Sequence, residues 1–305
     1  MNFKSLAVGF NHICGIGTDS RAYCWGDNSS GELGIGTIDD RLHTPAAIVS
    51  SQNFTAVAAG YDFTCALTSA GAAICWGLNY LGSVGSGSVA TLLPTPTNVI
   101  GGVTFTAISA GNGNTVCGVT TTSDVWCWGQ NDLGQLGNGT SDALPHPTPT
   151  RVTALSGVRS LAVGWRHSCA VTTAGGLCWG ANDVGQLGTA TSQRTCIDEF
   201  GDGTPCTTVP QAVTGGGRFR LVAVGDDHSC GIDSDGFAFC WGSNLLGQLG
   251  NSSIDEDSAT PVPVDEPSFN DGFVPLPLRA SIMFHSIHAH VIPARPKNLL
   301  RRAVR

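Results

Sequence analysis

The chain has 305 residues and a formal net charge of −8; only 12% of its residues are charged, and 41 are glycine. Because its only lysines are Lys4 and Lys297, no phosphate-loop, Schiff-base or general-base lysine lies between them, which excludes several classes of enzyme. All 23 acidic residues precede residue 276. A body this acidic repels phosphate backbones, so we expect it to bind no nucleic acid.

A Cys-Trp-Gly tripeptide recurs along the chain with its tryptophan at spacings of 51, 52, 51 and 62 residues. Upstream of each tryptophan lies a short apolar run that ends in glycine. An asparagine stands three residues after each tryptophan. Next comes Gly-x-Leu-Gly, which drifts to Gly82-Ser83-Val84-Gly85 in the second copy. Such self-similarity identifies a repeat architecture. The repeats cover approximately residues 3–50, 51–101, 102–155, 156–214 and 215–264, anchored by Trp25, Trp76, Trp128, Trp179 and Trp241.

Each repeat reads as short strands separated by turn residues. In the third copy we expect strands at Phe105–Ala110, Val116–Thr120 and Val125–Trp128, with an outer strand near Arg151–Val152. A four-stranded unit of about 50 residues buries both faces only by stacking on its neighbours, with each tryptophan wedged between adjacent blades. The sequence therefore predicts an all-β fold, a β-propeller of five recognisable blades over residues 1–264. An open β-solenoid is the alternative, although its periods are shorter.

The combined pattern of apolar-x-x-Gly, His-Ser-Cys, Cys-Trp-Gly-x-Asn and Gly-Gln-Leu-Gly resembles the regulator-of-chromosome-condensation repeat over about residues 3–264. It is most similar to the cysteine-paired version found in bacterial proteins, and also to the propeller of the type II β-lactamase inhibitor proteins. The resemblance implies a propeller, usually of seven blades, that acts mainly through protein–protein contacts. Five copies fall short of seven, so the ring is incomplete, closes atypically, or pairs with another copy.

The twelve cysteines fall into six sequence pairs, and in five of them the two members flank a predicted hairpin turn. Facing strands bring Cβ atoms to about 4.5–5.5 Å, within reach of a disulfide after small adjustment. Free core thiols are the alternative, whereas zinc would need converging Cys-x-x-Cys pairs, which are lacking. The predicted disulfides are Cys14–Cys24, Cys65–Cys75, Cys117–Cys127, Cys169–Cys178, Cys196–Cys206 and Cys230–Cys240.

These cysteine pairs predict an oxidising compartment, so we expect an extracytoplasmic or secreted protein. The first residues, however, lack the apolar run and small-residue cleavage site of a signal peptide. A cytoplasmic protein remains the alternative. No run of roughly eighteen apolar residues is present, so the sequence predicts no membrane-spanning helix.

Three histidines, His12, His167 and His228, share one repeat position, two residues before the first cysteine of the blade. Phe63 and Thr115 fill that position in the other copies, which disfavours a catalytic or metal-binding role. We expect these histidines to hydrogen-bond the backbone of the blade.

An insertion of about ten residues between Cys196 and Cys206 is our candidate for contact with a partner, because propeller function usually resides in loops. Calcium binding by its acidic residues is one interpretation, although the spacing does not match an EF-hand loop. The other is an acidic surface loop closed by a disulfide, which we favour. The candidate residues are Asp198, Glu199, Phe200 and Asp202.

The segment 265–305 lacks the motifs of the repeat, and we expect it to be an atypical basic tail that is poorly ordered. His285, His288 and His290 form only a weak metal pattern there. A shifted reading frame or degenerate end is one explanation of the change, and an Arg-rich binding tail is the other.

No catalytic motif, metal site or cofactor site stands out, so we expect a non-enzymatic scaffold that binds another protein through propeller loops. The alternatives are a guanine-nucleotide exchange factor for a small GTPase and an inhibitor of an enzyme such as a β-lactamase. An inhibitor would need an aromatic-rich loop face, to which Trp165 and Tyr61, just after their strand-ending glycines, would contribute. The reducing cytosol in which small GTPases work argues against the exchange factor.

Overall fold

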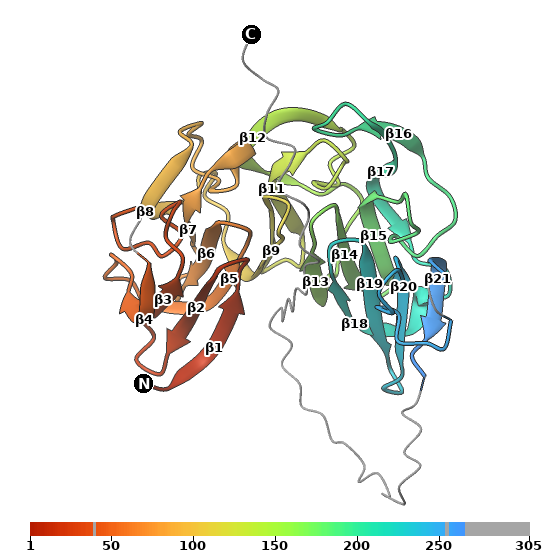
Figure 1. Cartoon of the computed structure of the whole chain (residues 1–305), viewed down its shortest axis with the longest axis horizontal. Helices are drawn as coiled ribbons and strands as arrows, with labels where there is room; N and C mark the ends of the chain where they lie inside the picture. The colour runs from red at the N-terminus through yellow and green to blue at the C-terminus, as the bar shows by residue number, and fades with distance from the viewer. Residues whose placement is uncertain (39–40, 254–255, 266–305) are drawn as a thin grey trace, which may run out of the picture.

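A computed structural model describes residues 1–38, 41–253 and 256–265 of the chain. Its strands form five antiparallel sheets that stand side by side as an arc (Figure 1). Two short 3-10 helices, η1 (Tyr80–Gly82) and η2 (Gly216–Arg218), complete the regular structure of these residues. The prediction of an all-β chain with five propeller blades is confirmed. The predicted tail lies outside the described residues from residue 266 onward, as do its three histidines.

Each sheet takes all its strands from one repeat, and we number the sheets as blades 1 to 5 in chain order. Blade 1 comprises β1 (Phe3–Val8), β2 (His12–Gly17), β3 (Ala22–Gly26) and β4 (Leu42–Ala47). Blade 2 comprises β5 (Phe54–Ala59), β6 (Phe63–Thr68), β7 (Ala73–Leu78) and β8 (Leu92–Asn98). Blade 3 comprises β9 (Phe105–Ala110), β10 (Thr115–Thr120), β11 (Val125–Asn131) and β12 (Asp142–Arg151).

Blade 4 differs from the others because the insertion of its repeat adds a strand. It comprises β13 (Ser160–Val163), β14 (His167–Thr172), β15 (Gly175–Ala181), β16 (Arg194–Ile197) and β17 (Gly203–Ala212). The added strand β16 pairs with β17 at the outer edge. Blade 5 is again four-stranded, with β18 (Phe219–Val224), β19 (His228–Asp233), β20 (Ala238–Gly242) and β21 (Ser258–Pro263).

The outer strand of blade 3 begins about ten residues earlier than the sequence suggested. β12 spans Asp142–Arg151 and contains Pro145, Pro147 and Pro149. Proline is tolerated there because an outer strand presents half of its N–H groups to solvent, where a missing donor costs no ladder hydrogen bond. The predicted strand near Arg151–Val152 was therefore only the end of a longer one.

The hydrophobic core lies between the blades rather than within them. Four buried clusters each combine side chains from two consecutive blades, and each contains one tryptophan of the later blade. The four indole N–H groups donate to backbone carbonyls in the Gly-x-Leu-Gly segment of the preceding blade, at distances of 2.7–2.9 Å. These pairs are Trp76 with Glu32, Trp128 with Ser83, Trp179 with Gln135, and Trp241 with Gln186.

The last glycine of that segment makes room for the incoming tryptophan. Gly34 has a φ of +67°, and a Cβ built on it would lie 2.7 Å from Nε1 of Trp76. A side chain at Gly34 would therefore suffer both backbone strain and a collision with the indole ring. The repeat glycine and the repeat tryptophan are two halves of one contact between blades.

Two of the repeat histidines, His12 and His167, hydrogen-bond hydroxyl side chains of the next blade, which the expectation of partners in the backbone of their own blade did not include. Nε2 of His12 lies 2.9 Å from Oγ1 of Thr64, and Nε2 of His167 lies 2.7 Å from Oγ of Ser229. Both rings are buried, and burial lowers the pKa of His12 to about 4 and that of His167 to about 3. Both histidines are thus neutral parts of the blade interfaces.

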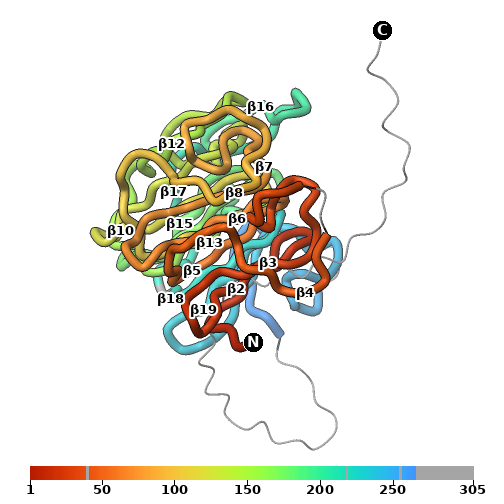
Figure 2. Tube along the Cα trace, turned by 90° about the vertical axis from the view of Figure 1, so that its left-hand side faces the viewer, coloured from red at the N-terminus to blue at the C-terminus, as the bar shows by residue number. Residues whose placement is uncertain are grey.

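The arc of blades is open. Blade 1 and blade 5 stand apart in Figure 1, and Figure 2 shows blades 1 and 2 from the side. Among the described residues no other blade packs on Trp25, which is partly exposed, whereas the other four repeat tryptophans are fully buried. Phe3 covers part of the Trp25 ring, with the two ring centroids 5.6 Å apart.

Candidate functional site

The two ends of the propeller carry different connections. In every blade the first strand turns into the second at the same end at which the third strand leaves for the fourth. We call this the loop end, and we call the opposite end, with its short turns between second and third strands, the turn end. The loop end bears the insertion of blade 4, so the candidate contact residues lie there.

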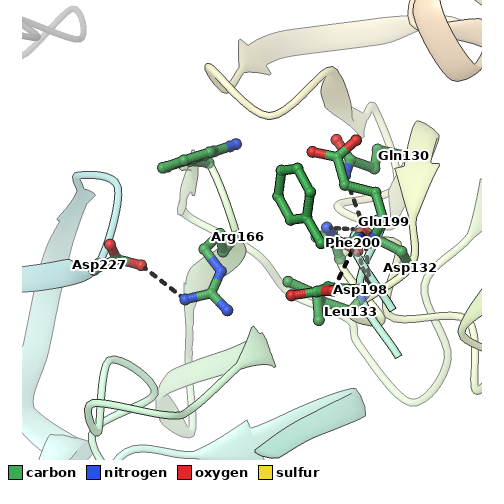
Figure 3. A pocket seen from close by; sticks show the side chains of 10 residues that line it. Gln130, Asp132, Leu133, Arg166, Asp198, Glu199, Phe200 and Asp227 are labelled. Carbon is green, nitrogen blue, oxygen red and sulfur yellow. Dashed lines mark hydrogen bonds and ion pairs between the residues drawn. The ribbon is translucent and has the colours of Figure 1, made fainter. Parts of the chain in front are cut away.

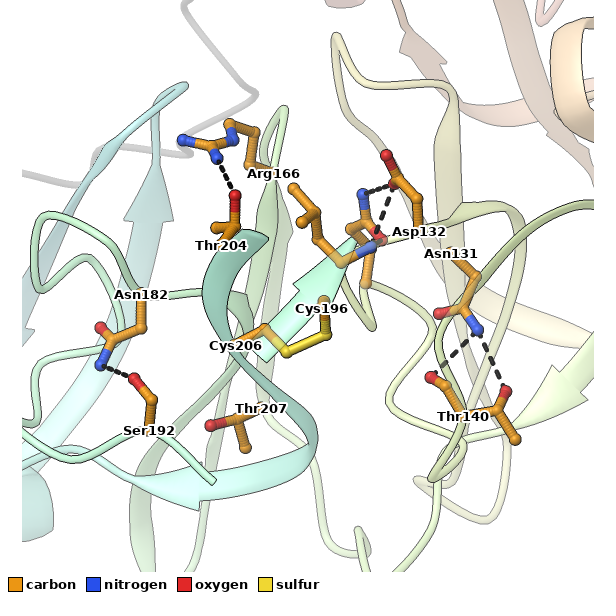
Figure 4. Close-up of a disulfide and its surroundings, with 12 residues drawn as sticks. Asn131, Asp132, Thr140, Arg166, Asn182, Ser192, Cys196, Thr204, Cys206 and Thr207 are labelled. Carbon is orange, nitrogen blue, oxygen red and sulfur yellow. Dashed lines mark hydrogen bonds between the residues drawn. A yellow bond between two sulfur atoms is a disulfide. The ribbon is translucent and has the colours of Figure 1, made fainter. Parts of the chain in front are cut away.

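The insertion forms a hairpin between β16 and β17 that the Cys196–Cys206 disulfide ties together (Figure 4). At its tip the carboxylate of Asp198 accepts hydrogen bonds from the backbone N–H groups of Phe200, at 3.0 Å, and Asp202, at 2.8 Å. These bonds hold the tip in a defined turn. The Phe200 side chain projects from it and is 79% exposed.

The tip is anchored to the neighbouring blade through Asp132 of blade 3. The Glu199 N–H donates to one carboxylate oxygen of Asp132 at 3.1 Å. The other oxygen accepts from the side-chain amides of Gln130, at 3.0 Å, and Gln135, at 2.8 Å. Asp132 is only 2% exposed, so it positions the insertion from below rather than contacting solvent.

A pocket of about 230 Å³ opens beside this tip (Figure 3). Trp165 and Phe200 contribute aromatic walls, and Asp198 and Glu199 contribute carboxyl groups. Burial and the nearby Asp132 and Asp198 raise the pKa of Glu199, while a hydrogen bond from Tyr80 opposes the shift. The pocket thus combines flat apolar surfaces with negative charge.

Arg166 is the cation in this pocket, and its charge is already matched. Its guanidinium lies 2.7 Å from a carboxylate oxygen of Asp183 and 3.4 Å from one of Asp227. Burial disfavours the ionised form of Asp183, but hydrogen bonds from Arg166 and Gln186 outweigh it and lower the pKa of this carboxyl group. Burial raises the pKa of Asp227 despite the same arginine. Because aspartates already balance the charge of Arg166, the carboxyl groups of Asp198 and Glu199 give the pocket a net negative charge.

Exposed aromatic side chains gather at the loop end. Tyr61 is 39% exposed and stacks on Phe10, with ring centroids 4.3 Å apart. Tyr80 of blade 2 and Trp165 of blade 4 are exposed to a similar extent, and Phe200 more so. Rigid aromatic side chains of this kind anchor protein–protein interfaces.

The structure brings the four predicted contact residues together on one hairpin tip, but sequence analysis missed their supports. Asp132, Tyr80 and Arg166 come from blades 2 to 4 and are far from the insertion in the chain. One signal was available for the first two. They occupy the position directly after the repeat asparagine, where side chains of the loop end converge.

The calcium interpretation of the insertion gains no support from the geometry. One oxygen of Asp198 is engaged by backbone N–H groups, which a cation would have to displace. Within residues 1–38, 41–253 and 256–265, no group of three or more His, Cys, Asp or Glu side chains is arranged to hold a metal ion. None of the helices in that part of the chain is long and apolar enough to cross a membrane.

The twelve cysteines form six disulfides, in the pairing that the sequence indicated. The five blade disulfides join facing residues of the second and third strands, with Cα atoms 4.0–4.1 Å apart. The sixth, Cys196–Cys206, is buried with Leu133 and Ala181 beneath the insertion. It therefore fixes the base of the hairpin whose tip carries Phe200.

Comparison with known proteins identifies relatives over most of the chain. The family model for the RCC1-like domain matches residues 1–280. The ultraviolet-B receptor UVR8 of Arabidopsis thaliana is 30% identical over 260 residues, which are 82% of this chain and 56% of UVR8. The human E3 ubiquitin-protein ligase HERC2 is 30% identical over 262 residues, 82% of this chain and 5% of HERC2. The chain thus spans about half of UVR8 and a small part of HERC2.

Solved structures show the same fold. The crystal structure of Prp20p from Saccharomyces cerevisiae, a protein characterised for its binding to Gsp1p and histones, matches with a TM-score of 0.75 and 23% identity. The match covers 88% of this chain and 64% of that one. Human WBSCR16 matches with a TM-score of 0.71 and 20% identity, over 86% of this chain and 67% of the other.

Proposed function

This chain belongs to the family of RCC1-like domains, and we propose that it is a non-enzymatic scaffold that binds another protein at its loop end. The single observation that carries the proposal is the convergence of exposed aromatic side chains from two blades around the insertion of blade 4, namely Tyr80 of blade 2, beside Glu199, and Trp165 and Phe200 of blade 4. Interfaces depend on a few such anchors surrounded by polar groups, and the carboxylates at this end supply the polar surround.

The insertion is suited to this role because it is held rigidly. A disulfide closes its base, Asp198 orders its tip, and Asp132 of blade 3 fixes it from the side. Preorganisation of this kind reduces the entropy lost when a partner binds. The exposed Phe200 ring is thus presented to a partner by a scaffold that does not have to rearrange.

We further propose that the protein works in an oxidising compartment. Six disulfides, five of them in the blades, persist where thiols are not kept reduced. This argues for an extracytoplasmic partner and against a cytosolic small GTPase. If captured partners are nucleotide-binding proteins, a nucleotide-release assay tests the exchange-factor alternative directly; if they are β-lactamases, an inhibition assay tests the other.

Site-specific photocrosslinking tests the proposed binding surface. A photoreactive phenylalanine analogue at position 200 is compared with the same analogue at position 237, since Phe237 is 62% exposed but lies at the turn end. We expect proteins from the source organism to crosslink specifically from position 200. Equal crosslinking from both positions, or from position 237 alone, would contradict a partner site at the loop end.

A further inference from the structure

We propose that the loop end recognises a partner segment rich in lysine and arginine, and that the pocket beside Trp165 and Phe200 takes one of its cationic side chains. This inference rests on the proposed function, since it names the chemistry of the protein that is bound. Three observations support it: the excess of carboxylates at the loop end, the repulsion among these carboxylates, and the aromatic side chains that line the pocket.

Negative charge is concentrated at the loop end. Among the described residues of this end, the basic side chains other than histidine are those of Arg41, Arg166 and Arg194. Two of them are already engaged, since Arg41 lies 3.8 Å from Asp27 and Arg166 pairs with two aspartates. The carboxylates of this end are Asp27, Glu32, Asp62, Asp132, Asp142, Asp183, Asp198, Glu199, Asp202, Asp226, Asp227, Glu256 and Asp257.

The turn end has no such excess within the described part of the chain. Two of its basic side chains have local partners: Arg151 lies 2.7 Å from Asp124, and Lys4 donates to the Ser20 hydroxyl. Acidic and basic groups are therefore nearly balanced at the turn end. The excess negative charge of the propeller thus lies at the loop end. The basic residues are Lys4, Arg21, Arg151, Arg159, Arg218 and Arg220, and the acidic ones are Asp19, Asp124, Asp233, Asp235 and Asp265.

The carboxyl groups of the loop end repel one another. Burial and neighbouring acids together raise the pKa of Asp62 and of Glu199 above their ordinary values. Such shifts mean that approach of a positive charge would be favoured, because it would relieve this repulsion. A basic segment supplies that charge, whereas the phosphates of a nucleic acid would add to the repulsion.

The pocket gives this attraction a defined place. Its volume of about 230 Å³ is several times that of one water molecule, so it admits a side chain. Trp165 and Phe200 both line it, and an ammonium or guanidinium group against an aromatic face gains cation–π attraction. Glu199 and Asp198 line the same pocket, and both backbone hydrogen bonds to Asp198 end on its Oδ1, so its Oδ2 and the Glu199 carboxyl group pair with the cation.

Peptide titration tests the inference with the full chain. The probes are fluorescent peptides of equal length made of Lys, Arg and Gly, of Glu and Gly, and of Ser and Gly, followed by anisotropy at about 50 and about 300 mM NaCl. We expect the basic peptide to bind, the acidic and neutral peptides not to bind, and the affinity to fall with salt. Equal binding of the neutral and basic peptides would overturn the inference.

Two charge variants separate local recognition from the general attraction of an acidic protein. Asp198→Asn with Glu199→Gln removes two carboxylates of the pocket, and the Asn side chain keeps the oxygen that orders the tip. Asp235→Asn with Asp265→Asn removes two exposed carboxylates of the turn end. We expect the first variant to lose about fivefold in affinity and the second to lose little. Equal losses would mean that binding is not located at the pocket.

The aromatic wall has its own control. Phe200→Leu keeps an apolar side chain but removes the π face, so we expect a loss of about two- to fivefold for the basic peptide. Wild-type affinity in this variant would exclude the cation–π contact. Specific crosslinking from position 200 together with no preference for the basic peptide would leave the proposed function standing and refute only this inference.

Discussion

The indole N–H of Trp76 donates a 2.8 Å hydrogen bond to the backbone carbonyl of Glu32 in the preceding blade. The Thr64 hydroxyl donates to the same carbonyl at 3.0 Å. Beside these contacts the Glu32 side chain is fully buried, and its Oε1 has no hydrogen-bond partner among the described residues. Three other blades carry glutamine at this repeat position, namely Gln135, Gln186 and Gln248.

Replacing the buried acid with the glutamine of the other blades should stabilise the protein. Burial, with added repulsion from Asp62 and Asp27, raises the pKa of Glu32 to about 6. The resulting penalty grows as pH rises from about 4.5 through 6 and is present in full above it. We expect Glu32→Gln to raise the free energy of unfolding by about 1 kcal/mol at pH 7.5 and by much less near pH 4.5.

Urea denaturation at the two pH values measures this difference, and Gln135→Glu is the reciprocal control. Gln135 donates to Asp132 at 2.8 Å, so a carboxylate there would repel its neighbour and destabilise the fold at pH 7.5. An equal effect of Glu32→Gln at both pH values would show that ionisation of Glu32 carries no penalty.

The buried histidines should make the protein lose stability in mild acid. Burial lowers the pKa of His12 to about 4 and that of His167 to about 3, from an ordinary value of 6.5. The unfolded chain therefore binds the extra protons first, and stability falls as pH drops below about 6.5. We expect each histidine to cost about 2 kcal/mol between pH 7.5 and pH 5.

Substitution by phenylalanine, which blade 2 carries at this position as Phe63, tests the histidine prediction. His12→Phe should flatten the fall in unfolding free energy between pH 7.5 and pH 5, measured by urea titration. The unchanged His167 provides the residual slope, and the double variant should remove most of it. A slope unaltered by both substitutions would assign the acid sensitivity to other groups.

The open edge of the arc predicts unequal roles for equivalent tryptophans. Trp128 is fully buried between blades 2 and 3, so Trp128→Ala should cost about 3–5 kcal/mol of unfolding free energy. Trp25→Ala should cost far less, because this ring is partly exposed and no other blade in the described part of the chain packs on it. Chemical denaturation of both variants decides the matter. Similar losses would imply that Trp25 is covered in solution by another element.

Disulfide removal should separate stability from binding. Cys65→Ser with Cys75→Ser opens a blade loop with a sequence separation of 10, and we expect it to cost about 2–3 kcal/mol of stability. Cys196→Ser with Cys206→Ser loosens the base of the insertion and should weaken binding of the basic peptide.

Mass spectrometry after alkylation, with and without reduction, should find all twelve cysteines blocked until reduction. Freely alkylated thiols would contradict the oxidising compartment.

The sequence was sufficient for the blades because the repeat marks its own structure. The spacing of Trp25, Trp76 and their successors located the sheets, and the paired cysteines indicated which strands face each other. The outer strands were harder to predict, since prolines such as Pro145 and Pro147 suggest loops. Their acceptance depends on lying at an edge, which is a property of the assembled sheet.

Contacts between blades could not be predicted from the sequence of a single repeat, because each contact joins residues of two repeats. The partner of His12 is Thr64, 52 residues later, and the histidine position alone gives no sign of it. Likewise Asp132 supports Glu199 across 67 residues of sequence. The loop of Asp198 and Phe200 could be proposed as a contact element from its length and composition, whereas the pocket beside it required the arrangement of blades 3 and 4.

Hydrogen–deuterium exchange of the full chain with and without the bound basic peptide tests the central claim most directly. The account predicts that protection on binding is confined to the loop end, strongest in the insertion around Phe200 and in the turn that carries Trp165. Turn-end segments, such as the turn that carries Phe237, serve as the internal control and should exchange as before. Protection centred on the turn end, or an exchange pattern unchanged by saturating peptide, would contradict it.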